Sequence, residues 1–177
     1  MKKILTLPTW QVFVLLILPC IFPSSYCGIV LTILYGIFST NCIYFLGTSL
    51  YKKLPVGHDL KIKSFTFYLF FAIAYLTIVF ILFDGGYEIN QDNYKNYGWT
   101  IAIIIPLHIF TMFSLFYVIW FIAKAIETIE RKNVVGFGEY AGNFFLLWFF
   151  PIGIWWVHPK VRKIFQVDIE RLPTTRV

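Results

Sequence analysis

Charged side chains are scarce in this sequence: 14% of its 177 residues are Asp, Glu, Lys or Arg, while 59% are hydrophobic and 21% are aromatic. A soluble domain carries about a quarter of its residues as charged groups, because its surface faces water. The balance therefore excludes an ordinary soluble domain and predicts an all-α integral membrane protein. We expect a single membrane domain covering residues 1–177.

The familiar signatures of catalysis and cofactor binding are also absent. No Gly-x-Ser-x-Gly, His-Glu-x-x-His, Walker or dinucleotide-binding motif occurs, so we expect neither a cofactor nor a metal. Cys20, Cys27 and Cys42 show no Cys-x-x-Cys spacing. We read them as free thiols, with a disulfide between the first two as the alternative. The chain shows no internal duplication, which disfavours a transporter built from inverted repeats.

Acidic residues are fewer than basic ones, nine against fifteen, and the basic residues are not spread evenly. If both chain ends and the segments 51–63 and 124–142 share one side, only Lys95 among the fifteen lies on the other side. Cytoplasmic loops of membrane proteins show this excess of Lys and Arg. The pattern predicts a cell-membrane protein with cytoplasmic termini and a basic face toward anionic lipid headgroups. It gives no reason to expect nucleic acid binding.

Four apolar segments are long enough to cross the hydrocarbon core, which needs about 20 residues. They are residues 4–22, 28–50, 64–83 and 99–123. We expect the first to remain as a span and not to be cleaved as a signal peptide, because no small-x-small cleavage signal follows it.

A fifth apolar segment, residues 143–158, is too short to cross. The uncharged residues 144–157 would form a helix of about 21 Å, against a hydrocarbon core of about 30 Å. Pro151 and Gly153 predict a break or a kink in its middle. A full crossing would also place the basic tail, residues 159–177, on the side that is otherwise poor in Lys and Arg. We therefore expect a re-entrant or interfacial helical segment.

Small and polar residues recur at four-residue intervals along the second span. This stripe consists of Thr32, Gly36, Thr40, Tyr44 and Thr48. Small residues on one helix face allow another helix to approach closely, which favours helix association in lipid. Beside the stripe, Asn41 needs a hydrogen-bond partner near the middle of the membrane. The stripe either holds helices together within one subunit, or forms a contact between subunits or the lining of a pore.

The fourth span contains the strongest candidate for a functional polar group. His108, Thr111 and Ser114 are three residues apart, so they lie near one helix face, with the histidine close to the hydrocarbon centre. An ionisable residue at that depth usually faces a bundle interior or a watery path. The alternative is a neutral imidazole that bonds Asn41 or Thr40 and serves packing alone.

Two polar pairs near the basic face invite a metal or acid–base interpretation. His58 and Asp59 are adjacent in sequence, and Glu127 and Glu130 share a face of the helix that continues the fourth span. A zinc site needs three or four ligands, so we read the first pair as a solvated turn. We read the glutamates as a solvated charged face, in which Glu127 pairs with Arg131.

Residues 138–159 contain the run Trp-Phe-Phe-Pro-Ile-Gly-Ile-Trp, followed by a Pro and basic residues. This run resembles the C-terminal signature of small uncharacterised bacterial multi-span membrane proteins. The resemblance implies a membrane location and brings no activity with it. In size and span number the chain is also similar to small accessory or effector membrane proteins of bacterial defence loci, some of which form oligomers. That likeness is one of architecture alone.

Three functions follow as hypotheses. The first is a non-enzymatic protein that forms homo-oligomers through the second-span stripe and opens a path or alters permeability, as an antiviral effector would. The second is an adaptor that holds a cytoplasmic protein partner at the bilayer. The third, an intramembrane lipid-modifying enzyme, is the weakest, because Ser114 lies nearly two helical turns from His108, beyond hydrogen-bond reach.

Overall fold

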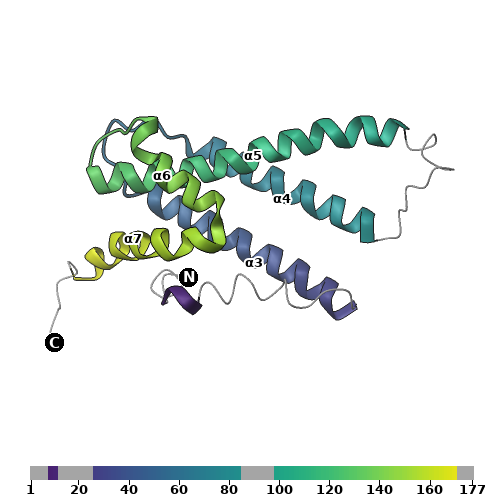
Figure 1. The fold of residues 1–177 in the computed structure, drawn as a ribbon, viewed down its shortest axis with the longest axis horizontal. Helices are drawn as coiled ribbons and strands as arrows, with labels where there is room; N and C mark the ends of the chain where they lie inside the picture. Colours follow the sequence, from purple (N-terminus) through teal and green to yellow (C-terminus); the bar gives the residue numbers. More distant parts are fainter. Residues whose placement is uncertain (1–7, 12–25, 85–97, 171–177) are drawn as a thin grey trace. The chain divides into compact units, whose positions relative to one another are not determined.

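The computed structural model describes residues 8–11, 26–84 and 98–170, and this part of the chain is helical without strands. Its long elements are α3 (Tyr26–Tyr51), α4 (Ile62–Asp84), α5 (Gly98–Arg131), α6 (Phe137–Trp148) and α7 (Phe150–Glu170) (Figure 1). The predicted all-α class is therefore confirmed. The chain divides into unit 1, residues 1–62 and 119–177, and unit 2, residues 63–118.

Two of the described helices are long and apolar enough to cross a membrane. They are Ile62–Val79 of α4 and Ala102–Arg131 of α5. Within an 18-residue stretch of each, only 22% and 17% of the residues are buried, whereas the core helix of a soluble protein would be mostly buried. The described residues thus contain two helices able by length and composition to cross a membrane, where the sequence predicted four.

The difference concerns the first two predicted spans. Most of the segment 4–22 lies outside the described residues. The segment 28–50 is helical, as part of α3, but this helix is not one of the two candidate spans.

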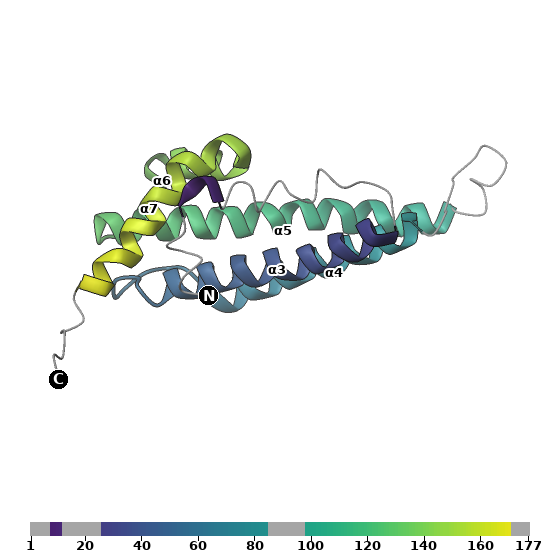
Figure 2. The same ribbon diagram turned by 90° about the horizontal axis from the view of Figure 1, so that it is seen from below.

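Aromatic packing holds unit 2 together. In this unit α4 and the first part of α5 lie side by side in both ribbon views (Figures 1 and 2). The ring of Tyr68 contacts Phe110, Phe113 and Tyr117, with centroid distances of 6.0, 6.1 and 4.5 Å. Phe71 meets Phe110 edge to face at 4.7 Å. Each such pair contributes about 0.5–1.5 kcal/mol beyond simple burial.

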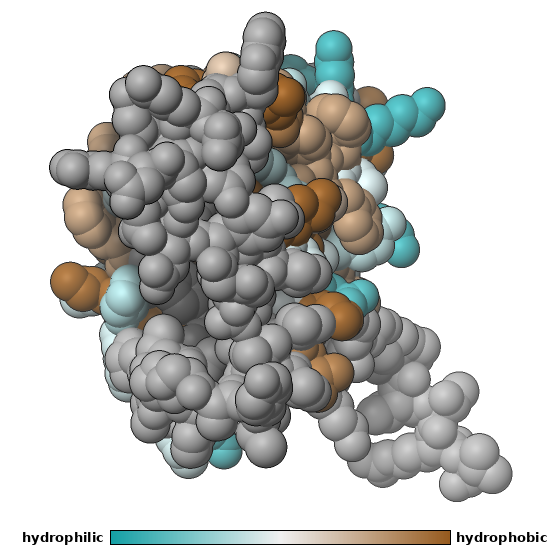
Figure 3. Space-filling view, turned by 90° about the vertical axis from the view of Figure 1, so that its right-hand side faces the viewer, coloured by the Kyte–Doolittle hydropathy of each residue, from teal (hydrophilic) through white to brown (hydrophobic). Residues whose placement is uncertain are grey.

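Large apolar side chains also cover the outer surface of unit 2. Those exposed by about half or more are Phe67, Phe70, Ile78, Ile103, Ile105, Ile109 and Phe113. On the face drawn in Figure 3, hydrophobic side chains (brown) form much of the described surface, with hydrophilic ones (teal) mainly at its edges. Contiguous exposed apolar surface of this kind marks contact with lipid or with another protein.

The end of α5 is the central element of unit 1. Residues 121–128 are all buried, unlike the exposed first half of the same helix. Phe121 is fully buried, and the Tyr51 ring at the end of α3 stacks on it at 6.5 Å. On the other side, Ala123 packs in a small apolar cluster with Tyr140 of α6. One segment of α5 thus holds elements that are far apart in the sequence.

The helices α6 and α7 meet at a sharp turn. The backbone leaves the helical conformation at Phe149, whose N–H donates to the Phe145 carbonyl at 2.9 Å. The predicted break therefore lies two residues before Pro151. Pro151 itself falls in the first turn of α7, where its missing N–H leaves no intrahelical bond unmade. The helix then runs to Glu170, so the first part of the predicted basic tail is helical.

A close approach between α6 and α7 depends on Gly153. This residue is buried, and a Cβ added to it would lie 2.8 Å from the Cα of Leu146 and closer still to the carbonyl of that residue. Atoms of real side chains do not come so near to a backbone. The two helices can pack in this way only because the position carries no side chain.

Candidate functional site

The densest group of polar contacts in the described chain lies in unit 1, where the end of α5 meets α6 and α7. Its centre is Glu127, which is buried. Asn143 of α6 donates from Nδ2 to Glu127 Oε2 at 2.9 Å, and Arg131 donates from Nε to Glu127 Oε1 at 2.6 Å. Lys160 of α7 places its Nζ 3.7 Å from Glu127 Oε2. A buried carboxylate is stable only when it is paired and hydrogen-bonded, and here both oxygens are engaged.

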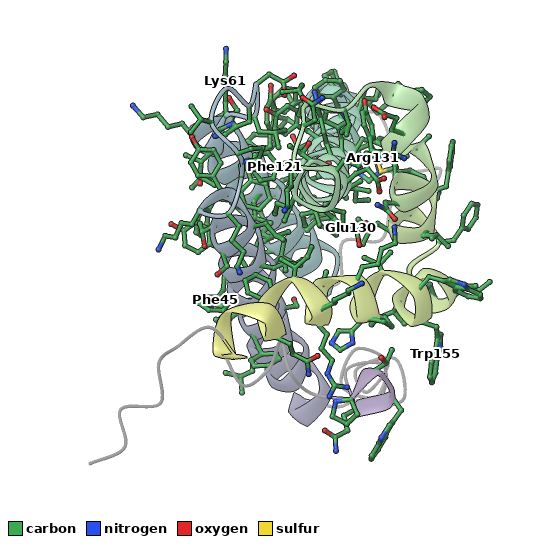
Figure 4. All side chains as sticks on the ribbon, turned by 90° about the vertical axis from the view of Figure 1, so that its left-hand side faces the viewer. Phe45, Lys61, Phe121, Glu130, Arg131 and Trp155 are labelled. Atoms are coloured by element: carbon green, nitrogen blue, oxygen red, sulfur yellow. The ribbon has the colours of Figure 1, made fainter. Side chains whose placement is uncertain are left out.

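Further bonds extend this group across the three helices. Lys160 Nζ donates to Glu130 Oε2 and to Asn143 Oδ1, both at 3.2 Å. Arg131 Nη1 donates to Glu139 Oε1 at 2.8 Å. We call Glu127, Glu130, Arg131, Glu139, Asn143 and Lys160 the polar network. Figure 4 labels Glu130 and Arg131, whose side chains extend from the end of α5 toward α6 and α7.

Glu139 also stabilises the start of α6. Its Oε2 accepts the backbone N–H of Gly136 at 2.8 Å, the reach-back bond of a capping box. A carboxylate in the first turn also interacts favourably with the helix dipole. The same side chain therefore starts α6 and, through Arg131, ties that helix to α5.

The predicted pairing of Glu127 with Arg131 is confirmed, but the predicted solvated face is wrong for Glu127. Its side chain is 10% exposed, whereas that of Glu130 is 30% exposed. The reason is tertiary: Asn143 and Lys160 come from α6 and α7 and cover a carboxylate that would face water on an isolated helix. Neither partner was predicted, because nothing in the local sequence links them to Glu127.

A second polar group joins the loop after α3 to α5. Lys124 is buried, and its Nζ donates to Asp59 Oδ2 at 2.5 Å. The ammonium also lies 5.4 Å from the ring centre of Trp120 and 6.0 Å from that of Tyr140. The hydrogen bond from Lys124 lowers the pKa of Asp59 and outweighs the opposing effect of burial. Asp59 is therefore an ion-pair partner of Lys124, although its side chain remains 56% exposed, as the prediction of a solvated turn requires.

No metal site arises near this loop. The His58 ring lies edge-on to Tyr51, with centroids 5.0 Å apart. Within the residues that the structure describes, no three His, Cys, Asp or Glu side chains are grouped to hold a metal ion. Cys42 is a free thiol, and Cys20 lies outside the described residues.

Two more contacts fix α7 within unit 1. Lys53 donates from Nζ to the carbonyl of Ile164 at 3.0 Å and lies 4.9 Å from the Phe165 ring centre. Near the start of the chain, Thr9 Oγ1 lies 3.1 Å from His158 Nδ1. The inner side of α7 is thus held at several points along its length.

The polar residues predicted on the fourth span do not form a common site. Thr111 and Ser114 are buried, and each donates its hydroxyl to a backbone carbonyl one turn earlier at 2.8 Å. His108 is exposed, and its Nδ1 lies 3.4 Å from the hydroxyl of Tyr75 in α4. That hydroxyl donates to the carbonyl of Ile104 at 3.2 Å. Within unit 2 the histidine contact that the structure gives is therefore with Tyr75, and the predicted contact with Asn41 or Thr40 stays a prediction.

The predicted stripe lies along α3, and the hydroxyls of Thr40 and Thr48 are bonded inside that helix. Thr40 donates to the Gly36 carbonyl at 2.5 Å, and Thr48 donates to the Tyr44 carbonyl at 2.8 Å. Asn41 is exposed and donates to the Ile37 carbonyl at 2.7 Å. A Cβ added at Gly36 would meet no described atom within 4 Å. No described atom therefore fills the space beside this glycine.

Comparisons of the chain with protein-family models, with curated proteins and with solved structures find no match. Function is therefore argued from the residues themselves.

Proposed function

We propose that this protein is a non-enzymatic membrane protein that forms homo-oligomers in the bilayer. The observation that carries the proposal is the exposure of His108 within the apolar window of α5. Its neighbours Ile105 and Ile109 are exposed by 54% and 65%, so the surrounding surface suits lipid. An imidazole facing hydrocarbon is costly, and residues of this kind usually face protein or a water-filled path. A second copy that covers this face removes the cost.

The space that the described residues leave beside Gly36 supports the same proposal. Close helix contacts in lipid form where small residues allow backbones to approach, and exposed amides provide hydrogen bonds between helices. The described residues leave space for a neighbour at Gly36, and the exposed Asn41 lies five residues further along α3. This pair of residues suits a contact between copies, with α3 as a further span.

The contacts of unit 1 support the proposed orientation. The loop after α3 and the end of α5 meet through Asp59 and Lys124. Both segments are rich in Lys and Arg, and their contact requires the same side of the membrane. By the positive-inside rule this side is the cytoplasm, with both chain termini there, and α6–α7 as a re-entrant or interfacial hairpin.

Local bonding of the hydroxyls argues against the lipid-modifying enzyme. A nucleophile needs a hydroxyl that is free to react and a base within reach. Thr111 and Ser114 instead donate to carbonyls of their own helix.

An adaptor for a cytoplasmic protein is a second candidate, favoured by exposed basic side chains on unit 1. These are Lys52, Lys61, Arg131, Lys132, Arg162 and Lys163. Such a surface would recognise an acidic partner. Co-purification of a protein that is lost when Lys61 and Lys132 are both changed to Glu would favour this candidate over self-assembly.

The test of self-assembly is the mass of the purified protein in lipid nanodiscs, together with crosslinking in vesicles. We expect an oligomer that is weakened by Gly36→Leu and by His108→Leu. Ile37→Leu, a conservative change beside the glycine, is the matched control and should assemble normally. Because no described atom lies within 4 Å of a Cβ added at Gly36, its variant should keep the wild-type melting temperature. A monomeric wild-type protein, or full assembly of both variants, would exclude the proposal.

A further inference from the structure

The turn between α6 and α7 exposes a group of large apolar side chains. They are Phe145, Phe149, Ile152, Trp155 and Trp156, which we call the aromatic tip, and their exposure lies between 48% and 63%. In Figure 4, Trp155 points away from the body of unit 1. So much exposed aromatic surface in one place marks a contact surface and not part of a core.

Helical periodicity gives α7 an inner and an outer face. Residues 154, 157, 158 and 161 are buried, and residues 152, 155, 156, 159, 162 and 163 are exposed. The outer face therefore changes character along the helix: it is aromatic and apolar near the turn with α6, and basic at Arg162 and Lys163. On the inner side, Lys160 is held by Glu130 and Asn143, which fixes the rotation of α7 about its axis.

We propose that the aromatic tip and the outer face of α7 form a docking surface for a bilayer leaflet that contains anionic phospholipid. The tip would enter the boundary between headgroups and acyl chains, where Trp side chains are favoured. Arg162 and Lys163, about two turns further along the same face, would then reach the lipid phosphates. The inference rests on the proposed membrane location and adds the lipid class that the hairpin recognises.

Charge complementarity favours lipid over a second copy of the chain. The acidic side chains that the structure describes in unit 1 are Asp59, Glu127, Glu130 and Glu139. Each already forms an ion pair, with Lys124, Arg131 or Lys160. A second copy therefore offers these carboxylates to Arg162 and Lys163 only by breaking existing pairs, whereas a lipid phosphate carries an available negative charge.

The experiment places a fluorescent probe on the full chain in vesicles. Cys20, Cys27 and Cys42 are changed to Ser, and a single new cysteine at Ile152 carries an environment-sensitive dye. Asn133→Cys, in the exposed turn after α5, provides the matched control site. Vesicles are made from phosphatidylcholine with and without phosphatidylglycerol. Quenching by brominated acyl chains reports contact with lipid, and quenching by iodide reports contact with water.

We expect the probe at position 152 to be quenched by brominated lipid and protected from iodide, more strongly when phosphatidylglycerol is present. The probe at position 133 should show the reverse. Changing Arg162 and Lys163 to Gln should remove the preference for phosphatidylglycerol, with the ratio of inserted to free hairpin falling about fivefold for each residue. High salt should weaken the same preference.

Three outcomes would overturn the inference. Iodide access at position 152 in both lipids would exclude docking, and equal insertion in both would exclude recognition of anionic lipid. Protection that disappears when the protein is diluted in lipid would assign the tip to a contact between copies. Crosslinking of the wild-type chain and of Gly36→Leu in the same vesicles reports self-assembly independently, so a failure of that proposal is distinguished from a failure of this one.

Discussion

Substitution of Gly153 by Ala is the sharpest test of the packing between α6 and α7. The new methyl group would overlap the carbonyl of Leu146 and lie 2.8 Å from its Cα. The obstacle is backbone inside a helix, which cannot rotate away as a side chain can. Non-bonded carbon atoms in van der Waals contact lie at least about 3.5 Å apart. To restore that separation, the two helices must move apart by roughly an ångström or more.

The magnitude follows by comparison with Gly142→Ala. That position is in α6, and an added Cβ would meet no described atom within 4 Å. Both changes gain the same helix propensity, about 1 kcal/mol in favour of Ala. Overpacking costs about 1–3 kcal/mol, more when a backbone is the obstacle. We therefore expect Gly142→Ala to be neutral or stabilising, and Gly153→Ala to be about 2–4 kcal/mol less stable than this control.

Hydrogen exchange of the backbone amides in detergent or nanodiscs measures this difference directly. In Gly153→Ala the amides of α6 and α7 should lose protection, because the hairpin opens, while those of α4 keep theirs. The control should retain protection throughout. If Gly153→Ala protects both helices as well as Gly142→Ala does, the close approach at Leu146 is wrong, and so is the arrangement of the aromatic tip that depends on it.

Two further predictions concern the ion pairs of unit 1. Glu127→Gln keeps a hydrogen-bond acceptor for Asn143 but removes the buried charge. We expect the free energy of unfolding to fall by about 1–3 kcal/mol. The control Glu130→Gln changes a more exposed side chain and should cost less than about 1 kcal/mol. Equal melting temperatures for the two variants would show that the buried ion pairs of Glu127 do not contribute more to stability than the exposed ion pair of Glu130. The pKa of Asp59 is lowered by Lys124, so its pairing stabilises the fold above its unfolded value of about 4 and is lost as the pH falls through the lowered pKa. In Asp59→Asn, the free energy of unfolding should therefore fall less steeply as the pH is lowered below about 4. The difference should be less than about 1 kcal/mol, because the carboxylate is largely exposed. An unchanged pH dependence would assign the loss of stability in acid to other carboxylates.

Features that depend on residue spacing within one helix could be predicted from the sequence. Helix type, the apolar windows of α4 and α5, and the pairing of Glu127 with Arg131 depend on spacing along a single element. The position of the break near Pro151 was also predicted to within two residues, since proline restricts the backbone wherever it stands.

Contacts between elements were not readable in the same way. The burial of Glu127 depends on Asn143, sixteen residues later, and on Lys160, which follows a further turn of the chain. The contact of His108 with Tyr75, within unit 2, was not among the predicted ones. Several polar side chains were possible partners for each of these residues, and nothing in the local sequence indicates which of them comes into contact.

The amino-acid sequence by itself determined that this chain is helical, rich in apolar residues and basic on the segments that flank its long apolar helices, because each property is a sum over residues or a period along one helix. Tertiary structure alone decided which charges are buried, where α6 may touch α7, and which face of α7 turns its aromatic and basic side chains outward. Those outcomes depend on the distance between atoms that lie far apart in the chain, and such distances are set only when the helices pack.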